Sequence, residues 1–257
     1  MFEFIVFLYG AIIGSFLNVL IYRLPLGLSI IKPIRSYCPS CGYQIKWYEN
    51  IPLLSYLFLK GSCSKCNEKI GLSYFVVELI SGLLAVFIYL KLGINFDFFI
   101  AIILFYLLLS LSFIDLKYKA VPDYLLLLCL IVMVFMPEFN LINALIFAGG
   151  FVLLDFIITF YIQNIKAKIT KNKELEDQVA LGEGDIPIVA VIGGILGIKL
   201  GVLAIFLAAI FAIFPSIYTS ITKKEIETPF IPYLTLGFAT VYFFSDTFLN
   251  LFIRYGL

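Results

Sequence analysis

Two acidic residues and two pairs of cysteines are the side chains of this sequence whose types and spacing could do chemistry. Asp185 follows Gly182-Glu183-Gly184, where a polar stretch enters an apolar segment. The two glycines let the backbone come close to whatever lies opposite, because neither carries a side chain. If Asp185 caps the following helix, Pro187 falls in the first turn, where a missing N–H costs little. The helix dipole would then favour the charged form of the Asp185 carboxylate.

Asp115 is the candidate partner of Asp185. It ends another apolar segment, and we predict that both acids lie at the same membrane depth. Two carboxylates a few ångströms apart cannot both ionise easily, so they share one proton. The ionised member can then take a proton from water while the neutral member donates to a peptide carbonyl, which hydrolyses the amide. Paired acids in a membrane also couple ions or protons in transporters, and that alternative stays open here.

The sequence contains no histidine. This absence excludes Ser-His-Asp and Cys-His catalysis and any histidine-ligated metal or haem. Acid–base chemistry near neutral pH would have to come from carboxylates, Lys, Tyr or Cys. A pair of carboxylates meets this condition.

Four of the cysteines form two Cys-x-x-Cys knuckles, Cys38-Pro-Ser-Cys41 and Cys63-Ser-Lys-Cys66. Four thiolates at this spacing suit one tetrahedral zinc, with two ligands from each knuckle. Two disulfides are the alternative, which a reducing cytoplasm disfavours. The surrounding segment, residues 26–72, is too short to bury much core, so a metal is a plausible means of stabilising it. We call this segment the cysteine loop.

The composition places these groups in a membrane protein, because 62% of the residues are hydrophobic and only 14% are charged. We predict an all-α polytopic fold of about eight transmembrane helices with a small zinc-ribbon-like domain in the cysteine loop. The division is a first helix (1–25), the cysteine loop (26–72) and a helix bundle (73–257). The predicted spans are 4–24, 73–91, 97–114, 121–136, 141–162, 186–198, 200–220 and 230–250.

The placement of positive charge predicts the orientation of the chain. Of the 18 Lys and Arg residues, all except Lys91, Lys199 and Arg254 fall in loops on one side. The positive-inside rule makes that side cytoplasmic, with both termini outside. The cysteine loop, Asp115 and Asp185 then lie on the cytoplasmic side of the membrane.

Several motifs, taken together and in order, resemble those of the type IV prepilin peptidase family over about residues 10 to 240. They are Gly14-Ser-Phe-Leu-Asn18-Val-Leu-Ile-Tyr-Arg23-Leu-Pro25, the two cysteine knuckles around Asn50-Ile-Pro-Leu-Leu-Ser55, Asp115 with Val121-Pro-Asp123, and Gly182-Glu-Gly-Asp185. The resemblance implies an aspartyl peptidase of the Gly-x-Gly-Asp type in the bacterial inner membrane, with Asp115 and Asp185 as its catalytic pair. Its implied substrates are type IV prepilins and pilin-like proteins, cut after the glycine that ends a short basic leader.

The resemblance also implies a second activity. Family members with the cysteine-bearing loop commonly methylate the newly exposed N-terminal amine with S-adenosylmethionine, and all four knuckle cysteines, the predicted ligands of a structural Zn²⁺, are present here. No glycine-rich nucleotide fingerprint is visible, so the sequence does not place the methyl-donor site. Ile186-Pro187 departs from the family pattern, where many relatives carry a lysine and then leucines, and we expect the peptidase activity to remain.

The expected partners are the prepilin substrates and the lipid bilayer, with no nucleic acid, and the sequence does not indicate the oligomeric state. Two rival functions remain at this point. One is a polytopic transporter with paired carboxylates and a structural zinc site, and the other is an assembly scaffold for a secretion machine.

Overall fold

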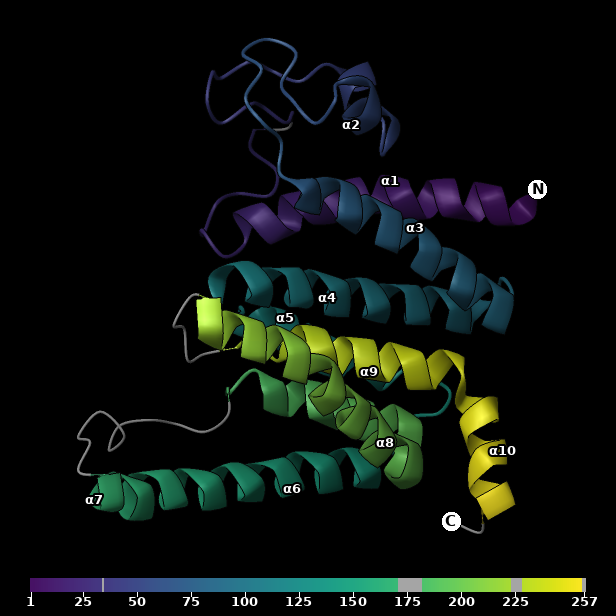
Figure 1. The fold of residues 1–257 in the computed structure, drawn as a ribbon. Helices are drawn as coiled ribbons and strands as arrows, with labels where there is room; N and C mark the ends of the chain where they lie inside the picture. The colour runs from purple at the N-terminus through teal and green to yellow at the C-terminus, as the bar shows by residue number, and fades with distance from the viewer. Residues whose placement is uncertain (34, 171–181, 223–227, 256–257) are drawn as a thin grey trace. The chain divides into compact units, whose positions relative to one another are not determined.

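The structure, a computed structural model, describes residues 1–33, 35–170, 182–222 and 228–255 of the chain. Within these ranges every regular element is a helix, and the only β-structure is a pair of isolated bridges in the cysteine loop (Figure 1). The predicted all-α fold is therefore confirmed. The chain divides into two compact units, Met1–Pro122 and Asp123–Leu257, and each is described by itself.

The first unit is built on three long apolar helices, α1 (Phe2–Arg23), α3 (Leu72–Leu92) and α4 (Phe96–Tyr118). Leu, Ile, Phe and Val occupy all faces of these helices, which is typical of helices in hydrocarbon. The cysteine loop connects α1 to α3 and contains two short helices, η1 (Trp47–Asn50) and α2 (Leu54–Phe58). Figure 1 shows this loop beside the N-terminal end of α3.

Small residues bring α1 and α3 into close contact. A Cβ atom added at Gly14 would lie 2.8 Å from Ser81 Cβ and 2.9 Å from Glu78 Cα. A Cβ atom added at Gly10 would lie 2.8 Å from Ala85 Cβ. Neither glycine can carry a side chain in this arrangement, so the two backbones approach as in other small-residue interfaces between membrane helices.

The second unit is organised around α8 (Asp185–Thr222), which packs against α5 (Asp123–Met133), α6 (Leu141–Phe160) and α9 (Ile231–Phe243). Helix α6 continues through a π-helical turn, η2 (Tyr161–Lys166), into the short α7 (Ala167–Thr170). The last helix is α10 (Ser245–Tyr255). Gly237 of α9 lies directly against the Ala204 carbonyl of α8, where a side chain would not fit.

The predicted number of eight spans is not confirmed. In the described part of the chain, five helices are long and apolar enough to cross a membrane, or six if α9 and α10, which meet at 74°, form one broken span. The predicted spans 186–198 and 200–220 lie in the single element α8, which is interrupted only at Gly197 (φ 71°, ψ −175°). The predicted span 121–136 contains α5, whose 11 residues are too few to cross the hydrocarbon region as a straight helix.

Candidate functional site

The cysteine loop brings four sulfur atoms together. The Sγ atoms of Cys38, Cys41, Cys63 and Cys66 all lie within 4.8 Å of one another. Cys38 Sγ is 3.8 Å from Cys66 Sγ, which matches the edge of about 3.8 Å in a tetrahedron with zinc–sulfur bonds of about 2.3 Å. All four are free thiols, as is Cys129, which is fully buried in α5. The spacing and chemistry of the four sulfurs therefore fit a structural metal.

The two knuckles have the same backbone geometry. In each, the N–H of the first cysteine donates to the carbonyl five residues later, and the N–H four residues later donates back to the cysteine carbonyl, at 2.9 to 3.0 Å. The residue after the second cysteine has a positive φ, 69° at Gly42 and 59° at Asn67. Glycine adopts this conformation freely, and asparagine is among the few other residues that tolerate it. The repeated turn thus presents two sulfurs from each knuckle.

Backbone N–H groups also prepare one of these thiols for metal binding. The N–H groups of Cys41 and then Ser40 donate toward the Cys38 sulfur and lower the pKa of its thiol from 9.0 to about 7. The thiolate is the form that binds a metal ion. Cys38 therefore ionises more easily than an ordinary cysteine.

A buried carboxylate on α3 holds the cysteine loop. Glu78 is only 9% exposed, and its Oε2 accepts a hydrogen bond of 2.8 Å from the Leu53 N–H. Leu53 has a φ of 63°, which its side chain disfavours. A strained backbone of this kind persists only where its surroundings over-determine it. The Glu78 carboxylate is one of the groups that do so here.

Two polar side chains of α1 complete the attachment of the loop. Asn18 Nδ2 donates to the Tyr74 carbonyl at 3.0 Å, at the start of α3. Arg23 is buried, and its Nη1 donates to three carbonyl groups that follow α1, at 3.0 to 3.1 Å. The segment leaving α1 and the segment entering α3 are both fixed by these contacts.

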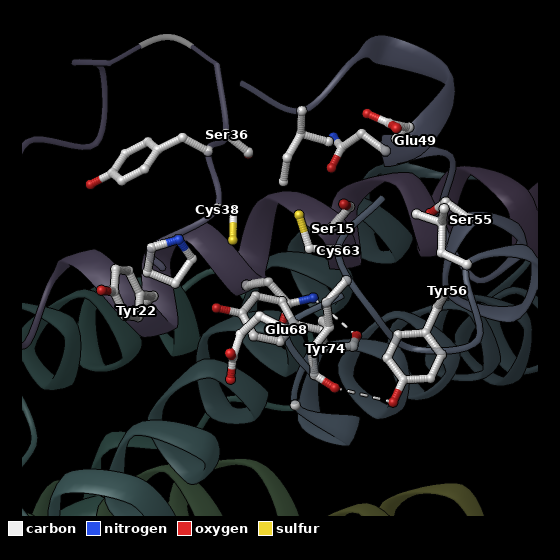
Figure 2. Close-up of a pocket in the computed structure, with 18 of the residues that line it drawn as sticks. Ser15, Tyr22, Ser36, Cys38, Glu49, Ser55, Tyr56, Cys63, Glu68 and Tyr74 are labelled. Carbon is white, nitrogen blue, oxygen red and sulfur yellow. Dashed lines mark hydrogen bonds between the residues drawn. The ribbon is translucent and has the colours of Figure 1, made fainter. Parts of the chain in front are cut away.

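Between the cysteine loop and helices α1 and α3 lies a partly open cavity of about 320 Å³, which we call the loop cavity. Figure 2 shows Tyr22, Cys38, Cys63 and Tyr74 around it. Its wall combines aromatic rings, carboxylates and small polar side chains. They include Ser15, Asn18, Tyr22, Glu49, Tyr56, Tyr74, Phe75 and Glu78.

Asp115 lies in the last turn of α4 and is 8% exposed. Its carbonyl accepts a hydrogen bond of 2.9 Å from the N–H of Lys119, which ends the helix in the left-handed conformation with a φ of 53°. The acid is therefore positioned by a rigid helix of the first unit, just before the chain leaves it.

Asp185 is the first residue of α8 and is 6% exposed. Its N–H donates to the Gly182 carbonyl at 3.0 Å, which closes a tight turn before the helix. A Cβ atom added at Gly182 would lie 3.4 Å from Asp185 Oδ2, so the backbone there is close to the carboxylate. Pro187 falls in the first turn of α8, as predicted. Leu181, which begins the motif, lies outside the described residues.

Asp115 and Asp185 thus belong to different units, and the structure describes each within its own unit. Both are buried acids at the end of an apolar helix. Their pairing stays a prediction.

The sequence singled out both acids and the four cysteines, but it did not identify the loop cavity, whose wall comes from three separate stretches of chain. Glu78, a carboxylate inside an apolar segment, is the sequence feature that could have indicated it.

Two protein-family models match this chain, one over the region of the cysteine loop and one over the region of the two aspartates. A family model described as Bacterial Peptidase A24 N-terminal domain matches residues 8–92, and one described as Type IV leader peptidase family matches residues 102–217. The chain is 34% identical over 244 residues to the prepilin leader peptidase/N-methyltransferase of Vibrio cholerae, covering 90% of this chain and 92% of that protein. The chain belongs to the type IV leader peptidase family.

Other members of the type IV leader peptidase family match along nearly the whole chain. The prepilin leader peptidase/N-methyltransferase of Bacillus subtilis is 31% identical over 258 residues, 98% of each chain. The protein of the same name from Legionella pneumophila is 29% identical over 285 residues, 98% of this chain and 95% of the relative. No solved structure matches.

Membership in the type IV leader peptidase family confirms the resemblance inferred from the motifs. Together with the apolar helices, it makes the chain a multi-pass protein of the inner membrane. The N-terminal match contains α1, the cysteine loop and α3, and the leader peptidase match contains both Asp115 and Asp185. The transporter alternative gains no support from these matches.

Proposed function

We propose that this chain cleaves the basic leader from type IV prepilins and pilin-like proteins and then methylates the new N-terminal amine. The observation that carries the proposal is the leader peptidase match over residues 102–217, which contains two buried acids at the ends of apolar helices. The relatives named above are prepilin leader peptidase/N-methyltransferases, so both activities occur together in proteins of this length.

Asp115 and Asp185 act as the catalytic pair in this proposal. With one proton shared between them, the ionised carboxylate takes a proton from a water molecule, which attacks the carbonyl carbon of the scissile bond. The neutral carboxyl group donates its proton to the carbonyl oxygen. Collapse of the resulting intermediate breaks the C–N bond and releases the amine, with its proton supplied by the pair.

The orientation predicted from positive charge suits this substrate. A prepilin has a basic leader in the cytoplasm and an apolar helix in the bilayer, so its cleavage site lies at the cytoplasmic boundary. We place the cysteine loop and both aspartates on that side, with both termini outside. The chain then comprises a first helix (1–25), the loop domain (26–72) and the peptidase bundle (73–257).

The cysteine loop binds one structural Zn²⁺ in this proposal, through Cys38, Cys41, Cys63 and Cys66. The fit of the four sulfurs to a tetrahedron supports it. S-adenosylmethionine is the second substrate, and when bound it supplies a methyl group on a positively charged sulfur. The mature N-terminal amine accepts this group.

The purified chain, incubated with a prepilin and S-adenosylmethionine, tests the proposal. Mass spectrometry should show loss of the leader and then a gain of one methyl group on the mature N-terminus. Without S-adenosylmethionine, only the first mass change should occur. A prepilin of unchanged mass would contradict the peptidase assignment, and a cleaved product without added methyl would contradict the second activity alone.

A further inference from the structure

We infer that the loop cavity is the binding site of the methyl donor, with the Glu78 carboxylate facing its positively charged sulfur. The inference rests on the proposed function, because it gives a location to the second of the two activities.

The cavity has the size for such a ligand. Its volume of about 320 Å³ lies within the range of roughly 300–1,000 Å³ that is usual for small-molecule sites. It is built entirely from the first unit, between the cysteine loop and helices α1 and α3. Its shape therefore depends on the contacts of Glu78, Asn18 and Arg23 described above.

The wall offers a group for each part of S-adenosylmethionine. Tyr56 and Phe75 stand with ring centroids 5.4 Å apart, and aromatic faces of this kind stack with purine rings. Glu49 supplies a carboxylate on the loop side, and carboxylates accept hydrogen bonds from ribose hydroxyl groups. The ring of Tyr74 and the carboxylate of Glu78 form the helix side, where a cation is favoured.

Glu78 is the residue that points most strongly to a cation. It is a carboxylate inside an apolar helix, where burial of a charge is costly unless the charge is compensated. Hydrogen bonds from the Leu53 N–H and the Ser15 hydroxyl compensate it only in part. Within the described ranges no ion pair joins Glu78 to a lysine or arginine. A cationic ligand in the cavity would supply the missing positive charge.

A second hollow adjoins this cavity. It shares Asn18, Tyr22 and Tyr74 with the loop cavity and is also lined by Phe113 and Lys117 of α4, the helix that carries Asp115. These two residues flank Asp115 in the sequence. An amine released beside Asp115 could therefore reach the donor along a surface of the same unit.

The transfer balances without a further reactant. The neutral amine of the mature N-terminus attacks the methyl carbon, and a new N–C bond forms. The S–C bond breaks, and its electron pair stays on sulfur to give S-adenosylhomocysteine. The positive charge passes from sulfur to nitrogen, so the product is a secondary ammonium group.

Binding of S-adenosylmethionine and of S-adenosylhomocysteine to the full-length chain, each by equilibrium dialysis, tests the site. Glu78→Gln keeps an oxygen that can accept from the Leu53 N–H but removes the charge. We expect it to raise the Kd of S-adenosylmethionine by about tenfold and to change the Kd of the neutral product much less. The ratio of the two constants within one preparation does not depend on the fraction that is folded.

Two further variants distinguish loss of the binding site from loss of folding. Ser15→Phe places a ring in the cavity wall and should abolish binding of both ligands. Glu138→Gln changes an exposed acid of the second unit and should leave both constants as in the wild type. Cleavage of a prepilin by the same preparations reports whether each variant is folded.

The outcomes distinguish this inference from the proposed function. If the wild type transfers methyl groups but Glu78→Gln and Ser15→Phe bind both ligands as the wild type does, the cavity assignment is overturned and the proposed function stands. If the wild type cuts the prepilin but neither binds nor transfers the methyl donor, both the inference and the second activity are overturned.

Discussion

The backbone N–H of Leu53 donates a 2.8 Å hydrogen bond to Oε2 of Glu78, joining the cysteine loop to membrane helix α3. The bond ends on a buried acid that also lines the loop cavity. The same side chain therefore positions the loop and shapes the pocket, and the metal centre, the cavity and the helix pair α1 and α3 form one connected assembly.

Glu78→Ala should loosen the cysteine loop, because it leaves the strained Leu53 N–H without its acceptor. The cost of an unpaired buried donor is about 1–3 kcal/mol. Hydrogen exchange of the peptide containing Leu53 should therefore become faster in Glu78→Ala, whereas Glu78→Gln should remain close to the wild type. Equal exchange in Glu78→Ala and the wild type would show that the bond does not hold the loop.

Removing one knuckle cysteine should remove the metal. We expect one zinc per chain in the purified wild type and none after Cys63→Ser, as measured by elemental mass spectrometry, because three thiolates leave the tetrahedron open. Cys129→Ser is the matched control, since this thiol is buried in α5 of the second unit and is not one of the four clustered cysteines, so the metal content should stay unchanged. A wild-type chain that contains no metal would remove the zinc assignment.

Gly14→Ala should destabilise the first unit. The new methyl group would lie 2.8 Å from Ser81 Cβ and 2.9 Å from the Glu78 backbone, so α1 and α3 must move apart, at a cost of about 1–3 kcal/mol. Gly149→Ala, in α6, provides the control, because nothing lies within 4 Å of the added atom and helix propensity improves. Thermal unfolding in detergent should show a lower Tm for the first variant only, and equal values would contradict the close packing.

The carboxylate of Glu49 should give the cysteine loop a pH-dependent contribution to stability. Hydrogen bonds from Ser64 and then from the Lys46 N–H lower its pKa below the usual 4.5. Because the pKa is lower in the folded chain, ionised Glu49 stabilises the fold above the unfolded-state value, and this contribution is lost as the pH falls through the folded value.

The comparison of Glu49→Gln with the wild type isolates this effect. Hydrogen exchange of the η1 segment should be faster in Glu49→Gln near neutral pH, and the difference should shrink at acidic pH and vanish where Glu49 is protonated in the folded chain. A difference of the same size at both pH values would show that the charge of Glu49 is not its cause.

Features encoded in short stretches could be predicted from the sequence. The two knuckles are such a case, because each is closed by hydrogen bonds within six residues, and so is the all-α fold of a chain this apolar. The number of spans could not be predicted. The predicted division at residue 199, where Lys199 interrupts the apolar run, lies close to the break at Gly197, but the two parts remain within one helical element, α8.

The loop cavity was also beyond prediction, for a different reason. Ser15, Tyr56 and Glu78 come from α1, the cysteine loop and α3, and no local pattern relates them. They meet because Gly10 and Gly14 allow α1 to lie against α3, and that contact depends on the tertiary structure.

Cleavage of a prepilin by Asp115→Asn and Asp185→Asn tests the central claim most directly. Mass spectrometry of the substrate over time gives the rate, with Glu138→Gln as the control and binding of S-adenosylmethionine as evidence that each variant is folded. The account predicts that either aspartate substitution slows cleavage by at least about a hundredfold, since each removes an acid–base group, while methyl-donor binding is retained. Cleavage at the wild-type rate in either variant would contradict it.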